Sequence, residues 1–560
     1  MSCTSSHALL RCLADNGVDR VFVVPGESYL GVLDALSDFD GIDVVTCRHE
    51  SGAAFMAAVD GRLTGRPGVA MVSRGPGATN AAIGIHAAQQ DAAPMILVIG
   101  QVPKKDLRKE AFQEIDYQQM FGSLAKWVCE VTAPEDLAAA AFKAVRVALS
   151  GLPGPVVLVI PEDIQQQQVA VPQWVAVRSS PTQPDPATVR QICRLLQTAR
   201  RPLIIAGSAL DRAGGREALL DLATQLQIPV AVSFRGHDLF PNQHALFAGD
   251  LGLANPAAQI AAFAGSDLIL ALGTRLGDIT TQGYRFPACP RPTQTLVHCI
   301  PDAHYLNQHF VADIGVVADP VATLRAILAA ASGAMDCRAR AEWAAQLNAL
   351  QRQIAAWPTL AADDGIPFVD VVRCLHRHAP GDLILCLDAG SFAAPVYRHF
   401  PFTFPQRLMA SLSGAMGYGT PAAVAAQLRR PAQKVVCLVG DGGFLMTGNE
   451  MVAAIERQLP ILFIVANNHC YGSIRIHQER SYPARSGRHA GTRLSNPDFV
   501  AVARAFGMAA EHVASADQVE AAVSRGLRAK GPYFIDVETS LSAVLPADIG
   551  GQAGAVLPVD

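Results

Sequence analysis

Residues 434–472, KVVCLVGDGGFLMTGNEMVAAIERQLPILFIVANNHCYG, contain two short apolar runs, each followed by a turn with polar residues. The β-branched run at 435–439 indicates a buried parallel strand that ends at the GDGG turn, 440–443. A helical segment follows, and a second apolar run at 461–465 ends on the asparagine pair 467–468. The stretch therefore predicts a βαβ unit with an acid and an amide at the carboxyl ends of its strands. Ligands bind at this edge in open α/β sheets.

The two turns offer the oxygen ligands that Mg²⁺ prefers when phosphate and water complete its coordination. Asp441 supplies a carboxylate, Asn468 an amide oxygen, and the following turn a backbone carbonyl, which we assign to Cys470. The glycines around Asp441 let the backbone approach phosphate oxygens closely. GDGG alone also suits an ordinary strand-to-helix turn. Together with the later asparagine pair, it predicts a metal ion held against a diphosphate.

The GDG turn followed by the asparagine pair resembles the signature of the thiamine diphosphate enzymes, and the chain is most similar to the acetolactate synthase large (catalytic) subunit group. The resemblance covers nearly the whole chain. It implies thiamine diphosphate and Mg²⁺ as cofactors, with Asp441, Asn468 and Cys470 as metal ligands. It implies cofactor-binding roles for the following residues: Gly390, Ser391, Phe392, Gly414, Ala415, Met416, Gly440, Asp441, Gly442, Gly443, Asn468, Cys470, Tyr471 and Gly472.

The composition of the whole chain fits a large globular protein. The 560 residues are 50% hydrophobic and 17% charged, enough for several hydrophobic cores. The net charge of −4 gives no argument for nucleic acid or membrane binding. No apolar run reaches transmembrane length, and the N-terminus does not resemble a signal peptide. The twelve cysteines form no CxxC pair, so we expect reduced thiols and a cytoplasmic protein.

Strands and helices alternate in three regions, which predicts an α/β fold of three doubly wound parallel-sheet domains. We place them at 1–168, 187–330 and 366–540, with a polar, proline-rich linker after the first and a flexible tail at 541–560. The first and third regions have similar order and size, which suggests an ancient duplication. The resemblance implies that the three domains are pyrimidine-binding, central Rossmann-like and diphosphate-binding. It also implies a homodimer or homotetramer with active sites at the dimer interface.

Two residues are expected to act on the cofactor rings. Glu50 follows a strand in CRHESGAAFMA, where an acid would ordinarily cap a helix. The resemblance implies instead that its carboxylate binds a nitrogen of the aminopyrimidine and so promotes loss of the thiazolium proton. Met416, in SLSGAMGYGTPAAVAAQ, matches the apolar residue that props the two rings together in the family. Core packing is the alternative role for Met416.

Three further residues are expected on the substrate side. Glu27 follows Pro-Gly in VVPGESYLGVLDAL and is either a second active-site acid or a helix cap. Gln113, in the family-like element AFQE, is expected to hydrogen-bond a substrate oxygen. His477 stands where acetolactate synthases have a tryptophan that shapes the acceptor pocket, so the usual acceptor preference is in question. His477 is expected either to take part in proton transfer or to be a surface residue.

The sequence leaves a third cofactor, FAD, open. GTRLGDITTQG keeps the glycine and arginine of the family's flavin loop, but Gly277 and Ile300 each replace an acid.

The leading functional hypothesis is decarboxylation of a 2-oxo acid, with pyruvate as the expected donor, and carboligation to a second carbonyl compound. A decarboxylase or lyase without ligation is the nearest alternative, favoured by Glu27 and His477. A non-catalytic paralogue of a synthase is the third hypothesis, and the presence of Glu50, Asp441 and Asn468 argues against it.

Overall fold

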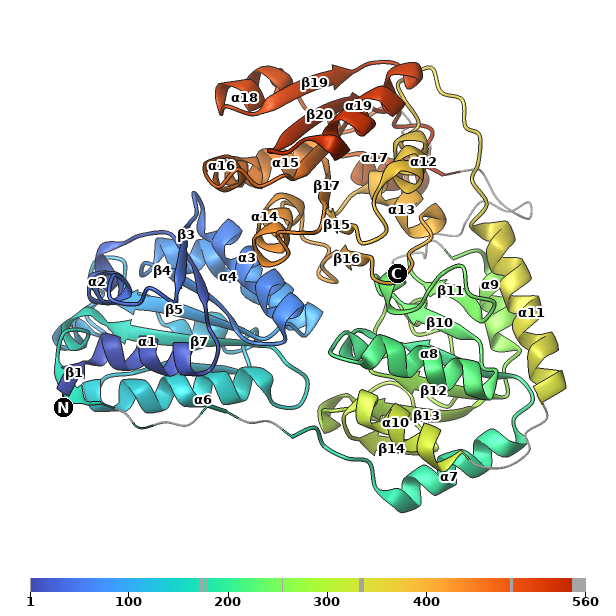
Figure 1. Ribbon diagram of the computed structural model, residues 1–560, viewed down its shortest axis with the longest axis horizontal. Coiled ribbons are helices and arrows are strands. Elements are labelled where there is room, and N and C mark those ends of the chain that lie inside the picture. The colour runs from blue at the N-terminus through green and yellow to red at the C-terminus, as the bar shows by residue number, and fades with distance from the viewer. Residues whose placement is uncertain are drawn as a thin grey trace.

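The computed structural model describes residues 2–545 except 172, 174–175, 178–179, 254, 332–336 and 484–486. Three six-stranded sheets form three lobes, coloured blue, green and orange-red along the chain (Figure 1). All strand pairs within these sheets are parallel, and helices cover both faces. The expected α/β fold of three doubly wound domains is confirmed. No helix in the described part of the chain is long and apolar enough to cross a membrane.

The first sheet has the strand order β3-β2-β4-β5-β7-β6. Its interior strands are continuous runs of Val, Ile, Leu and Met, as expected where helices cover both faces. The strands are β2 (Arg20–Val23), β3 (Asp43–Thr46), β4 (Gly68–Val72), β5 (Met95–Gln101), β6 (Trp127–Glu130) and β7 (Pro155–Pro161). The helices are α1 (Ser5–Asp15), α2 (Leu30–Leu36), α3 (Glu50–Thr64), α4 (Pro76–Asp91), α5 (Tyr117–Phe121) and α6 (Leu137–Leu149).

The central sheet has the order β11-β10-β9-β12-β13-β14, which is the order of Rossmann folds. Its strands are β9 (Pro202–Ala206), β10 (Val230–Ser233), β11 (Phe247–Leu251), β12 (Leu268–Leu272), β13 (Thr295–Ile300) and β14 (Ile314–Val317). Its helices are α7 (Pro186–Thr198), α8 (Gly215–Leu226), α9 (Ala257–Ala264) and α10 (Pro320–Ala330). A long helix, α11 (Cys337–Ile354), packs on β11 at the sheet edge before the chain enters the third lobe (Figure 1).

The third sheet has the order β16-β15-β17-β18-β20-β19, which repeats the order of the first sheet strand for strand. Its strands are β15 (Ile384–Leu387), β16 (Arg407–Met409), β17 (Val435–Gly440), β18 (Leu462–Asn467), β19 (Ala509–Val513) and β20 (Tyr533–Glu538). The helices are α12 (Phe368–His378), α13 (Ala394–His399), α14 (Gly419–Arg429), α15 (Asp441–Thr447), α16 (Met451–Glu456), α17 (Gly472–Ser481), α18 (Phe499–Ala505) and α19 (Ala516–Arg528).

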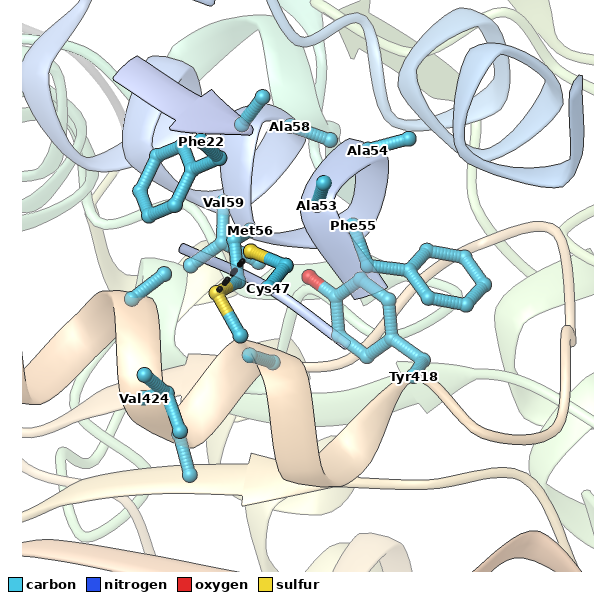
Figure 2. Packing of buried hydrophobic residues seen from close by; sticks show 14 of the residues in the cluster. Phe22, Cys47, Ala53, Ala54, Phe55, Met56, Ala58, Val59, Tyr418 and Val424 are labelled. Carbon is cyan, nitrogen blue, oxygen red and sulfur yellow. Dashed lines mark hydrogen bonds between the residues drawn. The ribbon is translucent and has the colours of Figure 1, made fainter. Parts of the chain in front are cut away.

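The first and third lobes share one hydrophobic core, built where α3 packs against α14. Both helices are rich in alanine, which lets their backbones approach closely. Phe55 of α3 meets Tyr418, just before α14, edge to face with ring centroids 5.6 Å apart, and Cys47 and Met56 pack beside them (Figure 2). This packing joins the two lobes into a continuous unit within one chain.

Buried ion pairs fix the central lobe against its two neighbours. Asp211 of the central lobe pairs with Arg62 of the first lobe at 3.2 Å and with Arg407 of the third at 2.8 Å. Arg216 contacts both Asp211 and Asp238. Although burial opposes ionisation, these three arginines hold the pKa of Asp211 well below its usual range. The three lobes are therefore held in a defined arrangement.

The structure adds short elements that the sequence pattern did not predict. Ser2–Thr4 (β1) pairs antiparallel with Gln168–Ala170 (β8), at the boundary between the expected first domain and the linker. At the other end, Leu541 and Ser542, expected in the flexible tail, donate backbone hydrogen bonds to Asp364. The rest of the tail, 546–560, lies outside the described residues.

Candidate active site

The loops that follow β15, β16, β17 and β18 meet at one edge of the third sheet. The switch point of this sheet lies between β15 and β17, and crevices at such points bind ligands. A Cβ added at Gly472 would lie 2.9 Å from Asn468 Nδ2 and 3.1 Å from Ser391 Oγ. A Cβ at Gly442 would lie 2.5 Å from the Tyr471 ring and 3.3 Å from the Met416 methyl carbon. The structure thus brings together the four segments that the sequence assigns to cofactor binding.

Asp441 lies at the centre of this edge, buried at the first position of α15. Its Oδ1 accepts a hydrogen bond from Gly442 N–H at 2.8 Å, and its Oδ2 accepts one from Cys470 N–H at 3.2 Å. Asn468 Oδ1 accepts a second bond from Cys470 N–H, at 3.1 Å. Burial raises the pKa of the Asp441 carboxyl, and these hydrogen bonds favour its ionised form.

These groups fit a hard divalent cation bound to a diphosphate. The donors are a carboxylate, an amide oxygen and backbone carbonyls, whereas His, Cys, Asp and Glu form no cluster of three suited to a metal in the described part of the chain. An oxygen-only set with one carboxylate suits Mg²⁺, which takes its remaining ligands from phosphate and water. The closely packed glycines leave backbone, not side chains, facing the site.

A second buried acid, Asp388, holds the loop that carries Met416. Its carboxylate accepts hydrogen bonds from Gly417 N–H and Gly419 N–H, both at 3.0 Å, and from Ala389 N–H at 2.6 Å. Burial raises the pKa of Asp388 to about 6. The sequence interpretation gave Asp388 no role. Its position directly after a strand was the available signal.

The first sheet presents the other candidate residues at its own carboxyl edge. Glu50 is the first residue of α3, and its Oε2 accepts a hydrogen bond from Asn80 Nδ2 at 2.9 Å. A Cβ at Gly77 would lie 3.2 Å from Glu50 Oε1, and one at Gly75 would lie 2.4 Å from the Gln113 carbonyl oxygen. Glu50 and Gln113 therefore both lie against the turn that enters α4, at Gly77 and Gly75 respectively.

The remaining substrate-side candidates are exposed. Glu27 begins a short 3₁₀ helix beside that loop, where a Cβ at Gly26 would touch Ser73. Phe112, the neighbour of Gln113, is 76% exposed. His477 is exposed on α17, where Arg475 and His489 both pair with Glu479. Among the described residues of one chain, no hydrogen bond or ion pair connects Glu27, Glu50 or Gln113 with the cofactor loops of the third sheet.

Glu450 is a functional candidate that the sequence interpretation missed. It belongs to the third lobe and is fully buried, yet its Oε1 accepts hydrogen bonds from Arg48 N–H at 3.0 Å and His49 N–H at 2.8 Å. Its Oε2 has no hydrogen-bond partner among the described residues. Burial, with a further contribution from Glu50, raises the pKa of Glu450 to about 7. No local pattern reveals this contact, because the partners are 402 and 401 residues apart.

The loops of the central lobe where the sequence left FAD open contact each other and the first lobe. At its switch point the loops after β9 and β12 close on each other, with Ala209 N–H donating to the Gly273 carbonyl at 3.0 Å. Arg275 donates to the carbonyls of Gln89 and Gln90 in the first lobe. The pocket where the three lobes meet, beside Arg62 and Arg235, has room for about one water molecule.

Family models match all three lobes. The N-terminal TPP binding domain of thiamine pyrophosphate enzymes matches residues 3–120, the central domain matches 189–327, and the C-terminal TPP binding domain matches 388–537. The chain belongs to the thiamine pyrophosphate enzyme family. It is a thiamine diphosphate-dependent enzyme, and the family named from the sequence motifs is confirmed.

Curated relatives extend the match over whole chains. The probable acetolactate synthase large subunit of Methanocaldococcus jannaschii is 30% identical over 97% of this chain and 93% of its own length. The acetolactate synthase isozyme 2 large subunit of Escherichia coli is 32% identical over 94% of each chain. The mitochondrial acetolactate synthase catalytic subunit of Saccharomyces cerevisiae is 29% identical over 98% of this chain and 82% of its own length. The chain is thus similar to acetolactate synthase large subunits from end to end.

Proposed function

We propose that this enzyme uses thiamine diphosphate and Mg²⁺ to decarboxylate a 2-oxo acid, pyruvate, and to ligate the two-carbon unit to a second carbonyl compound. The observation that carries the proposal is the convergence of the four cofactor loops on Asp441 in a chain similar throughout to acetolactate synthases. When bound, thiamine diphosphate supplies a carbon nucleophile and then an electron sink for decarboxylation. The domain roles follow the family: 1–168 binds the pyrimidine and 366–540 the diphosphate.

In this proposal the residues of the third lobe hold and bend the cofactor. Asp441, Asn468 and the Cys470 carbonyl bind Mg²⁺, which neutralises the diphosphate. The backbone of 390–392, 440–443 and 471–472 faces the phosphate oxygens. Gly414, Ala415 and Met416 would hold the pyrimidine, with Met416 as the apolar residue that props the two rings together. Asp388 is a positioning residue, because it fixes the N–H groups that follow Met416.

The residues of the first lobe manage protons and substrate. Glu50 would bind the pyrimidine nitrogen through Oε1 and promote loss of the thiazolium proton, while Asn80 holds Oε2. Gln113 donates an amide hydrogen bond to a substrate oxygen. Glu27 serves as a second active-site acid, and His477 forms part of the acceptor pocket. A carbon dioxide assay with pyruvate, combined with product analysis, tests the proposal. Acetolactate supports ligation, acetaldehyde indicates the decarboxylase alternative, and no carbon dioxide indicates a non-catalytic paralogue.

The active enzyme is proposed to be at least a homodimer, with each site built from two copies. Exposed apolar side chains flank both halves of the site: Leu445 and Met446 on α15, Ile83 on α4, and Phe112. A second copy would cover them. We place the protein in the cytoplasm, which the free thiols of its described cysteines support.

Subunit complementation tests this arrangement. Glu50→Gln and Asp441→Ala chains should each have little activity alone. Random mixing should restore about a quarter of parental activity, because half of the dimers then carry one intact site. Absence of restored activity, with mixed dimers demonstrated by tags, would place each site within a single chain.

A further inference from the structure

A continuous line of hydrogen bonds leads from the protein surface to Asp441. His512 Nδ1 lies 3.0 Å from Asp536 Oδ2, and Asp536 Oδ1 accepts from Asn467 Nδ2 at 3.1 Å. Asn467 Oδ1 accepts from Asn496 Nδ2 at 2.8 Å, and the same nitrogen donates to Asp441 Oδ2 at 2.8 Å. Asp536 lies on β20, Asn467 at the end of β18, Asn496 in a loop before α18, and Asp441 at the start of α15. The line therefore connects four separate elements of the third lobe.

Only one orientation of each amide along this line satisfies all of its hydrogen bonds. Asp536 in its ionised form can only accept, so Asn467 must turn its amide nitrogen toward it. The Asn467 oxygen then faces Asn496, which must present its own nitrogen. That nitrogen has two hydrogens, one for Asn467 and one for Asp441. Each amide orientation is therefore set by its neighbour, starting from the ionised carboxylate of Asp536.

Because these residues are buried, losing one of their hydrogen bonds is costly. Asp441 and Asn467 are each 3% exposed and Asp536 is 5% exposed. A buried polar group that loses its partner keeps the full cost of desolvation, about 1–3 kcal/mol. The Asn496 oxygen has no partner among the described residues, so this amide is held through its nitrogen alone. Truncating the side chain of any one inner residue leaves a donor or acceptor of its neighbour buried and unpaired.

We propose that Asn496, Asn467 and Asp536 are positioning residues that hold the Asp441 carboxylate in the orientation needed to bind Mg²⁺. The inference rests on the proposed metal role of Asp441. Asn496 occupies one lone pair of Oδ2, and the N–H groups of Gly442 and Cys470 occupy others. These three donors leave one lone pair of Oδ1 free to accept a cation. Asp536 does not contact Asn496 directly. It orients the Asn467 amide, and Asn467 in turn orients Asn496.

The test measures Mg²⁺ and cofactor binding by titration calorimetry on the full-length protein stripped of both ligands. Outer residues that orient metal ligands typically contribute 10–100-fold in metal affinity, so Asn496→Ala should weaken Mg²⁺ binding by about that factor. Asp536→Leu should weaken it in the same direction. Asp536→Asn should bind like the parent, because its amide oxygen still accepts from Asn467 and preserves the order of the line.

The matched control is Asn348→Ala. Asn348 is also a buried amide whose nitrogen donates two hydrogen bonds, to the carbonyls of His244 and Phe247, but it lies in the central lobe. It should lower the melting temperature without changing Mg²⁺ affinity. Asn496→Ser serves in place of Asn496→Ala if the alanine variant does not fold.

The outcomes separate this inference from the proposal beneath it. If the Asp441→Ala variant binds Mg²⁺ and cofactor like the parent, Asp441 is not a metal ligand and the proposed metal site is wrong. Asp441→Ala that fails to bind, combined with an Asn496 variant that binds like Asn348→Ala, would overturn the positioning role alone. Loss of affinity in Asp536→Asn equal to that in Asp536→Leu would also contradict it, because charge rather than hydrogen-bond direction would then matter.

Discussion

Glu450→Gln should change how the stability of this protein depends on pH. The carboxyl of Glu450 is buried between the first and third lobes, and burial raises its pKa from 4.5 to about 7. Because the folded-state pKa is raised, protonation stabilises the fold below pH 4.5, and this stabilisation is lost as the pH rises through about 7. The shift of about 2.5 pKa units, at about 1.4 kcal/mol each, corresponds to about 3 kcal/mol.

A glutamine at 450 keeps an oxygen for the N–H groups of Arg48 and His49 but does not ionise. Relative to the parent, the variant should therefore gain about 3 kcal/mol between pH 4.5 and pH 8, seen as a change of about 2–3 degrees in the difference between their melting temperatures. Melting of cofactor-free protein at fixed scan rate provides the measurement. The control is Glu456→Gln, which removes an exposed acid paired with Arg48 at the same interface. If the difference in melting temperature between Glu450→Gln and the parent stays constant from pH 4.5 to pH 8, the reasoning is refuted.

Three other substitutions test the site itself. Glu50→Gln should retain cofactor in calorimetry but lose on the order of a hundredfold or more in turnover, since an amide cannot exchange the proton; near-normal turnover would remove Glu50 from this role. Asp441→Ala should abolish Mg²⁺-dependent retention of thiamine diphosphate, and unchanged cofactor affinity would place the metal elsewhere. His477→Trp should shift acceptor preference toward 2-oxobutyrate over pyruvate by about 10–200-fold, because an indole offers a larger apolar wall for one more methylene. Product ratios from a mixture of the two acids measure this, and an unchanged ratio with bound cofactor would mean that His477 faces solvent.

The sequence predicted the local parts of this fold well. The apolar runs around Val435 and Ile464 are strands β17 and β18, and the GDGG turn begins α15 as expected. These elements were predictable because strand, turn and helix signals lie within a few residues of each other. Edge strands were harder: Arg407–Met409 and Ala509–Val513 are short or alternate in burial, and they carry no long apolar run.

The contacts between distant segments could not be predicted in the same way. Glu450 follows the GDGG motif closely, but nothing near it indicates that it binds the N-terminus of α3. Asn496 lies in a polar stretch that gives no local signal, and its importance depends on the strand order that brings β18 beside β20. Such residues are defined by which loops share a sheet edge, and a single sequence does not specify that arrangement.

The bonds between Asp364 and the end of the last strand affect where this protein can be divided. Asp364 precedes the third lobe, yet it accepts hydrogen bonds from Ser540 and Ser542 side chains at 2.5 and 2.8 Å, and Leu541 lies against the Gly472 loop. A fragment cut at the limits of the family match, 388–537, would lack both Asp364 and the serines that bind it. An excised diphosphate-binding lobe intended for crystallisation or domain exchange should therefore begin no later than Asp364 and continue past Ser542.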